Sequence, residues 1–213
     1  MEKKIKNGII AVRKPKGPTS FDVIHKLRKI SGIKKIGHAG TLDTLASGVL
    51  VVGIGREATR KLHEIVELEK EYMATIRFGE ESTTDDEAGE KSVVEFVKKP
   101  SRADVEKALA KFSGKIMQLP PNFSAIKIGG VRAYKMARRG QSPKLIKRPV
   151  EVKKIKIIKY KWPLLKIKII SGSGFYVRAL ARDLGRKLKV GGYLAALERT
   201  RVGQFKKNMA IKI

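Results

Sequence analysis

Residues 37–48 hold the side chains best suited to chemistry. This segment places His38 and Asp43 among three glycines and has neither helical nor strand periodicity. Glycines let a backbone fold back tightly and approach a ligand closely, and functional residues concentrate in such loops. Because the chain has no cysteine, its chemistry must use oxygen or nitrogen groups of this kind, or a bound cofactor. The structural alternative is a loop in which Asp43 bonds its own backbone and His38 is exposed.

A second candidate is Arg178, which follows a Gly172-Ser-Gly174 turn. If residues 176–188 form a helix, Arg178 falls in its first turn, where the helix dipole disfavours a cation by about 0.3–1 kcal/mol. A partner anion would explain this placement; the alternative is that the side chain reaches solvent or a phosphate. The two glycines alone are weak evidence for phosphate binding, because the rest of the dinucleotide fingerprint is missing.

The net charge points to a polyanionic partner. The 213 residues include 48 Lys and Arg against 20 Asp and Glu, a formal charge of +28, and nucleic acid is the partner that best neutralises such an excess. A Lys-rich surface that only aids solubility normally carries matching Glu. The absence of cysteine excludes disulfide scaffolds, iron–sulfur clusters and thiol nucleophiles, and the three histidines lack metal-site spacing. The longest apolar run, Val49–Val52, is far too short to cross a membrane. We therefore expect a cytoplasmic protein.

The hydrophobic patterns predict an α+β fold with a mixed, mainly antiparallel sheet and helices packed on it. The first expected helix begins at Thr19 or Ser20, and its apolar residues Phe21, Ile24, Leu27 and Ile30 share a face. The other expected helices are residues 58–66, 101–112, 132–139 and 176–188. The expected strands are residues 8–13, 48–54 and 72–78, a hairpin over 123–131 and two antiparallel strands within 152–170, with a polar loop over 34–47.

Two further segments have open interpretations. Residues 80–90 contain six acidic side chains; a solvated surface loop is the main reading and a Mg²⁺ site the alternative. Tyr160 and Trp162 stand among lysines, where they would either stack on bases or belong to a strand whose lysines protect a sheet edge. We favour edge protection.

Five motifs that cover the whole chain resemble, in order, the successive blocks of the TruB family of pseudouridine synthases. They are Lys14-Pro-x-Gly-x-Thr-Ser20, Gly37-His-x-Gly-Thr-Leu-Asp43-x-Leu-Ala-Ser-Gly48, Lys70-x-Tyr72, Gly174-x-Tyr-x-Arg178 with Asp183-Leu-Gly185, and Leu197-x-Arg-Thr-Arg-Val-Gly203. The ending Ala46-Ser47-Gly48 and the insertion from Pro120-x-x-x-Ser124-Ala125 to Gly140 are more similar to the bacterial tRNA enzymes than to the archaeal and eukaryotic guide-RNA relatives.

The resemblance implies isomerisation of one uridine, position fifty-five in the T-loop of tRNA, to pseudouridine without cofactor or metal. It assigns Asp43 as the nucleophile, Tyr72 as the ring under the flipped base, Arg178 as the partner of Asp43 and Asp86 as the acid of an active-site loop, the remaining loop acids being solvated. Burial alone raises the pKa of a carboxyl group, so an ionised Asp43 needs a fixed cation such as Arg178.

By the same resemblance, His38, Tyr176, Leu197 and Lys14 form the substrate-binding set, which holds the flipped nucleotide or takes its place in the RNA loop. Extruding a base costs a few kcal/mol, which aromatic or imidazole stacking partly replaces. This sequence departs from the family pattern at Thr44, where the family usually has proline. A proline there would keep the backbone of Asp43 away from helical φ and ψ angles, and threonine removes that restriction.

The resemblance further predicts a single catalytic domain over residues 1–213, with no C-terminal RNA-binding domain of the PUA type. The expected partner is tRNA, with no obligate protein partner, and the expected state is a monomer. Two alternatives differ in function: a non-catalytic module that binds or folds tRNA, and a synthase acting on another RNA. Asp43, Tyr72 and Arg178 together favour the enzyme, because folding assistance needs no nucleophile.

Overall fold

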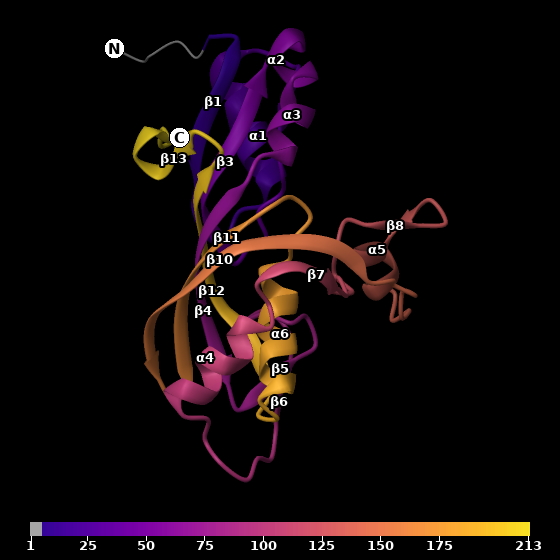
Figure 1. The fold of residues 1–213 in the computed structure, drawn as a ribbon. Helices are drawn as coiled ribbons and strands as arrows, with labels where there is room; N and C mark the ends of the chain where they lie inside the picture. Colours follow the sequence, from indigo (N-terminus) through magenta and orange to yellow (C-terminus); the bar gives the residue numbers. More distant parts are fainter. Residues whose placement is uncertain (1–5) are drawn as a thin grey trace. The chain divides into compact units, whose positions relative to one another are not determined.

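The computed structural model describes residues 6–213 and has an α+β fold with a mixed, mainly antiparallel sheet, which confirms the predicted class (Figure 1). The chain divides into two compact units. The first comprises the residues up to Met73 together with Leu197–Ile213, and the second is Ala74–Ala196. Strands β4 (Lys70–Phe78) and β12 (Gly192–Val202) contribute residues to both. The single catalytic domain expected from the sequence stays a prediction.

Strand β3 (Ala46–Ile54) is central to the first unit. It pairs antiparallel with β1 (Gly8–Lys14) along seven residues and with β2 (Ile36–His38) near its end, and its first residues pair parallel with Leu197–Arg199 of β12. A strand flanked on both sides and covered on both faces reads as a continuous apolar run. The predicted loop over 34–47 is too long at both ends. Ile36–His38 near its start forms β2, and Ala46 near its end begins β3.

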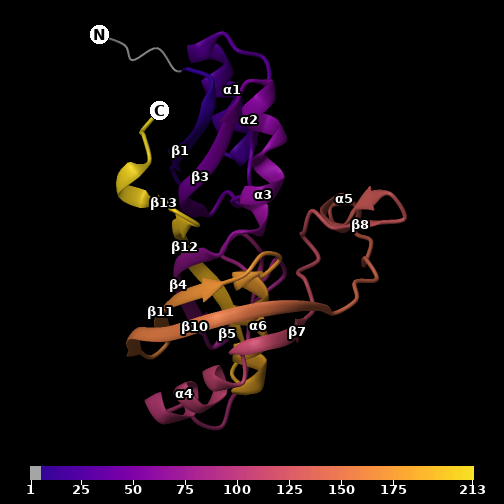
Figure 2. The ribbon, with the colours of Figure 1, turned by 45° about the horizontal axis from the view of Figure 1, so that its top comes forward.

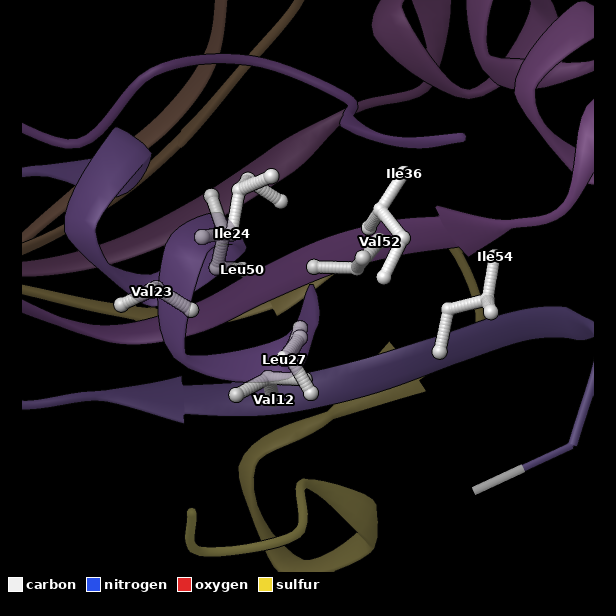
Figure 3. Packing of buried hydrophobic residues seen from close by; sticks show 8 residues of the cluster. All are labelled: Val12, Val23, Ile24, Leu27, Ile36, Leu50, Val52 and Ile54. Carbon is white, nitrogen blue, oxygen red and sulfur yellow. The ribbon is translucent and has the colours of Figure 1, made fainter. Parts of the chain in front are cut away.

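Helices cover both faces of this part of the sheet, as the alternation of side chains along β3 requires. Figure 3 shows one core, where α1 (Ser20–Ser31) packs on β1, β2 and β3; its buried residues are Val12, Val23, Ile24, Leu27, Ile36, Leu50, Val52 and Ile54. The intervening β3 residues face a second core, which includes Leu62 and Ile65 of α3 (Leu62–Glu67). The short helix α2 (Arg56–Arg60) precedes α3, so the predicted helix over 58–66 is two helices.

Helix α1 begins and ends as the sequence predicts. Thr19 and Asp22 form a reciprocal capping box, and Gly32 adopts the left-handed conformation at the C-terminus. The predicted apolar face is only half correct, because Phe21 and Ile30 are 55% and 52% exposed. Ser20 and Val23 are buried instead, which turns the helix so that the Ser20 hydroxyl faces the loop of residues 39–45.

In the second unit, the strands β11 (Leu164–Ser171), β10 (Arg148–Lys161) and β7 (Gly114–Gln118) are neighbours in this order. The predicted antiparallel pair within 152–170 is β10 and β11. Helix α4 (Arg102–Ala110), with the predicted capping box of Ser101 and Asp104, packs against α6 (Val177–Lys187). The hydroxyl of Tyr160 donates to the Pro100 carbonyl, and Trp162 packs on Phe78 and Phe96, so both rings serve packing within this unit.

Two hairpins complete the second unit, and a short strand closes the first. Strands β5 (Glu80–Ser82) and β6 (Lys91–Val93) enclose the acidic turn. Strands β8 (Lys127–Ile128) and β9 (Val131–Arg132) are followed by α5 (Ala133–Ala137), close to the predicted hairpin and helix. Strand β13 (Phe205–Lys206) pairs with β12, and a 3₁₀ turn covers Lys207–Met209. No helix within residues 6–213 is long and apolar enough to cross a membrane.

The register between β3 and β12 depends on Gly48. Its φ is +112°, and a Cβ atom there would lie 2.2 Å from the Arg199 carbonyl oxygen. We expect Gly48→Ala to lower the free energy of unfolding by roughly 3 kcal/mol or more, because conformational strain adds to a clash with backbone. Gly32→Ala is the matched control: its φ is +71° with no atom within 4 Å, so it should cost about 1 kcal/mol. Equal losses in urea unfolding would contradict the close approach.

Candidate active site

The backbone of the loop that carries Asp43 is fixed by hydrogen bonds. The Ser20 hydroxyl donates to the Leu42 carbonyl (3.0 Å) and accepts from the Leu42 amide (2.9 Å). The amide of Gly17 donates to the Thr44 carbonyl, and the amide of Ala46 to the carbonyl of Asp43. These bonds come from α1, from the turn before it and from β3, so they restrain the loop although Thr44 replaces proline.

A buried arginine on β12, Arg199, lies behind this loop. Its residue is 2% exposed, and its guanidinium donates to the carbonyl oxygens of Val49 (2.8 Å) and Gly40 (3.0 Å). The parallel pairing of Arg199 with Gly48 brings the arginine backbone against a residue without a side chain. The guanidinium thereby joins β3 to the start of the Asp43 loop.

Arg199 supplies a permanent positive charge to this part of the first unit. Burial lowers its pKa, whereas the neighbouring Tyr72 side chain and the Asp43 carboxylate oppose that shift. A guanidinium remains protonated despite such shifts because its intrinsic pKa lies far above neutral pH. Sequence reasoning missed this role and assigned the fixed cation to Arg178 alone. The only available signal was the position of Arg199 within the Leu197-x-Arg motif, since a charged residue in a strand ordinarily indicates a solvent-facing position.

Two lysines are also buried in the first unit. The ammonium of Lys14 donates to the carbonyl oxygens of Ala46 (2.7 Å) and Pro15 (2.9 Å), and that of Lys70 donates to the carbonyl of Val66. Burial lowers the pKa of each lysine to about 8, although Asp43 acts in the opposite direction on Lys14. Lys14 therefore supports the backbone at the end of the Asp43 loop, and its expected contact with substrate stays a prediction.

Two of the remaining predicted residues of the first unit, His38 and Tyr72, interact with the same charge. His38 ends β2, and burial together with Arg199 lowers its pKa, so that its ring is neutral near pH 7. Its Nδ1 atom is buried and makes no hydrogen bond within the described residues. Tyr72 is buried on β4, and Leu197 is half-buried opposite Ala46. The first unit thus places an aromatic ring, a neutral imidazole and the Asp43 carboxylate within the electrostatic reach of one guanidinium, that of Arg199.

The second unit holds Arg178 and Asp86. Arg178 occupies the first turn of α6, as predicted, and its guanidinium lies 3.6 Å from the Asp86 carboxylate. It also donates to the carbonyl oxygens of Phe123 (2.9 Å) and Thr84 (3.4 Å). The partner anion expected for this position is therefore present. The predicted ion pair of Arg178 with Asp43 joins residues of different units and stays a prediction.

Asp86 and Tyr176 are held by contacts of their own. Asp86 accepts from the Thr84 hydroxyl (2.6 Å) and from the Ala88 amide (3.0 Å), and it is 5% exposed. The backbone of Tyr176 exchanges two hydrogen bonds with the amide side chain of Gln118 (2.9 and 3.0 Å), which fixes the start of α6.

The expectation that the other acids of residues 80–90 are solvated is wrong for Asp85. Asp85 forms an ion pair with Arg182 at 2.8 Å, and its side chain is 15% exposed. Glu81 pairs with Arg186 at 3.1 Å. Successive turns of α6 present these arginines to the acidic turn, a long-range pairing that the local sequence does not reveal. Within residues 6–213, no three His, Asp or Glu side chains gather in a manner that would hold a metal ion.

Comparison with known families and proteins gives concordant matches. A family model described as "TruB family pseudouridylate synthase (N terminal domain)" matches residues 28–177, and one described as "tRNA pseudouridylate synthase B C-terminal domain" matches residues 178–213. The chain is 44% identical to tRNA pseudouridine synthase B of Streptomyces avermitilis, over 96% of this chain and 70% of that protein. It is 45% identical to the protein of the same name from Mycobacteroides abscessus, over 93% and 68%.

A solved structure has a similar fold. A chain of the "Crystal Structure of a Cbf5-Nop10-Gar1 Complex" superposes with a TM-score of 0.76 at 28% identity, over 99% of the present chain. The present chain spans about half, 53%, of that longer chain.

The burial of Lys14 predicts a pH dependence of stability. Its pKa in the folded chain is about 8, below its ordinary value of 10.5. Between these values the unfolded chain binds one proton more, so the free energy of unfolding rises with pH. Lys14 should contribute a rise of up to about 3 kcal/mol, which urea unfolding at pH 7.5 and 10 measures. Lys14→Met should lack this part, and Lys16→Met, at an exposed position, should retain it. An equal rise in both variants would contradict the buried ammonium.

Proposed function

Because this chain belongs to the TruB family of pseudouridylate synthases, we propose that it isomerises a uridine of tRNA to pseudouridine, at position fifty-five in the T-loop. The bond between N1 of uracil and the ribose C1′ breaks, the base rotates, and C5 bonds to C1′. The C5 hydrogen leaves as a proton and N1 takes up a proton, so the product is an isomer of the substrate. The reaction needs a nucleophile, a cation that keeps it ionised and a surface for the extruded base.

The observation that carries this proposal is the buried Arg199 with the buried Tyr72 and the half-buried Asp43 carboxylate as its electrostatic neighbours. Arg199 favours the ionised carboxylate of Asp43 without titrating itself. Its hydrogen bonds to Val49 and Gly40 hold that charge in place before substrate binds. A carboxylate kept ionised in a site that excludes water can attack the target nucleotide and form the covalent intermediate.

The other side chains have roles in binding the extruded nucleotide. Tyr72 offers a ring on which the base stacks, and His38, neutral at physiological pH, offers an imidazole. Leu197 and Tyr176 complete the proposed contacts with the nucleotide. Asp86 holds the guanidinium of Arg178, for which the family resemblance implies a role as a further partner of Asp43. Such contacts offset the few kcal/mol that extrusion of a base costs.

The basic surface fits the phosphates of tRNA. Its most one-sided element is residues 124–147, which overlap the insertion noted in the sequence and are called the insertion from here on. They contain seven basic and no acidic side chains: Lys127, Arg132, Lys135, Arg138, Arg139, Lys144 and Lys147. All seven residues are exposed, and phosphate contacts of this kind make affinity fall steeply as salt rises. We place the reaction in the cytoplasm, with a monomer acting on tRNA without an obligate protein partner.

Tritium release from C5-labelled uridine in an unmodified tRNA transcript tests the reaction, because formation of the C5–C1′ bond expels that hydrogen. We expect release by the parent and none by Asp43→Asn. The control Asp104→Asn changes an exposed carboxylate at the N3 position of α4, in the second unit, and should retain activity. A parent that binds tRNA tightly but releases no tritium would favour the non-catalytic tRNA-binding module, and release with pseudouridine mapped elsewhere would favour another RNA as substrate.

Arg199→Lys tests the observation behind the mechanism. Lysine keeps the charge but lacks the planar fork that reaches two carbonyl oxygens. We expect kcat to fall by roughly 10- to 100-fold, because a misplaced charge stabilises Asp43 less. Arg201→Lys, two residues further along the same strand and half-buried, should keep kcat within about twofold. Unchanged kcat in a folded Arg199→Lys protein would remove Arg199 from the mechanism.

A further inference from the structure

Three arginines on one face of α6 meet the acidic turn between β5 and β6. Arg178, Arg182 and Arg186 are spaced by four residues, which places them on neighbouring turns of one helix face. Their partners are Asp86 and Asp85 in the turn and Glu81 in β5, respectively. The outer pair, Arg186 with Glu81, is largely exposed, with side chains 58% and 36% accessible, whereas the side chain of Arg182 is only 9% accessible.

Arg182 uses its whole guanidinium in three directions. Nη1 donates to the carboxylate of Asp85, Nε to that of Asp183, and Nη2 to the backbone carbonyl of Leu119, each at 2.8 Å. A buried cation is costly unless it is paired and its donors are satisfied, as they are here. The proposed reaction gives Arg182 no role, although this residue joins two separate segments of the second unit.

The acidic turn is the fixed side of this junction. The amide of Leu194 donates to the Asp85 carbonyl, and the amide of Glu87 donates to the Leu194 carbonyl, both at 3.0 Å. Asp85 has a φ of +61°, a left-handed conformation that costs a non-glycine residue energy and persists only where the surroundings determine it. Both carboxylates that hold Arg182 therefore belong to anchored backbone, one in this turn and one in α6.

The other side of the junction is the segment of residues 119–123. It follows the end of β7 at Gln118 and leads into the insertion. Its first carbonyl, of Leu119, accepts from Arg182, and its last, of Phe123, accepts from Arg178. The backbone bonds that follow, from Tyr134 to Ser124 and from Ala133 to Ile126, lie inside the insertion. The two guanidinium groups thus hold both ends of the segment, while Pro120 and Pro121 stiffen its middle.

The insertion is an extension whose direction depends on this base. Figures 1 and 2 show β8 and α5 set apart from β7 and β10, at the end of two connecting lengths of chain. A small change of angle at residues 119–123 displaces the basic side chains at the far end by a larger distance. Phosphate contacts require those side chains to match the spacing of the RNA backbone.

We propose that Arg182 is a positioning residue for tRNA binding: by joining Asp85 to the Leu119 carbonyl, it sets the direction of the insertion against the RNA backbone. This inference rests on the proposed function, since it takes tRNA as the ligand. Arg182 is buried and contacts no RNA itself, so its effect on RNA binding passes through the insertion.

The salt dependence of tRNA binding distinguishes this role from a purely structural one. Binding of unmodified tRNA to the full chain is measured at several salt concentrations for the parent, Arg182→Gln, Arg182→Lys and Asp85→Asn. We expect the three variants to bind roughly tenfold more weakly, with a slope of log K against log salt about 1–2 smaller, because one or two phosphate contacts are lost. A loss of stability alone lowers the folded fraction and leaves this slope unchanged.

The matched control is Arg186→Gln, which removes the exposed pair one turn further along α6 and should retain the affinity and the slope of the parent. Thermal unfolding identifies any variant that fails to fold. If Arg182→Gln fails to fold, Arg182→Lys, which keeps the charge beside Asp85, provides the test. KM for tRNA should rise in the variants while kcat at saturating tRNA stays within about twofold. Parent-like affinity and slope in both folded Arg182 variants would overturn the proposal, and a parent that binds tRNA without tritium release would instead overturn the proposed function.

Discussion

A permanent charge in a dry environment is the constraint on which the first unit depends. Taking a guanidinium out of water costs several kcal/mol unless anions and hydrogen-bond acceptors replace the lost hydration. Arg199 finds two carbonyl oxygens, a tyrosine and a carboxylate. The same groups that make its burial tolerable are those that the proposed chemistry requires, so stability and function place the same demand on this residue.

The second unit uses charge in a different way. Arg178 and Arg182 also occupy buried positions, but they act between segments: each receives a carboxylate from the acidic turn and donates to a carbonyl that flanks the insertion. The six acids of residues 80–90 are thus more than a counterweight to a basic surface. Three of them form ion pairs with arginines of α6 and thereby fix the positions of those side chains.

Much of this architecture could be predicted from the sequence where local signals suffice. The capping boxes at Thr19 and Ser101 and the long pair β10–β11 follow from residue type and spacing. The motifs identified the Asp43 loop, yet the importance of Arg199 remained hidden, because no local pattern marks an inward-facing arginine whose partners lie 150 and 159 positions away. The burial of Asp85 depends on the same kind of distant partner, on α6.

The pairing of β12 with β3 also has a consequence for the order of events during synthesis. Leu197–Arg199 lie beside Ala46–Gly48, so the ribosome adds the Asp43 loop about 150 residues before the buried Arg199 that supports it. Contacts so distant in sequence form slowly, because a long loop must close first. A nascent chain still short of residue 199 carries the carboxylate without its buried charge. Synthesis must therefore pass residue 199 before the first unit can form completely.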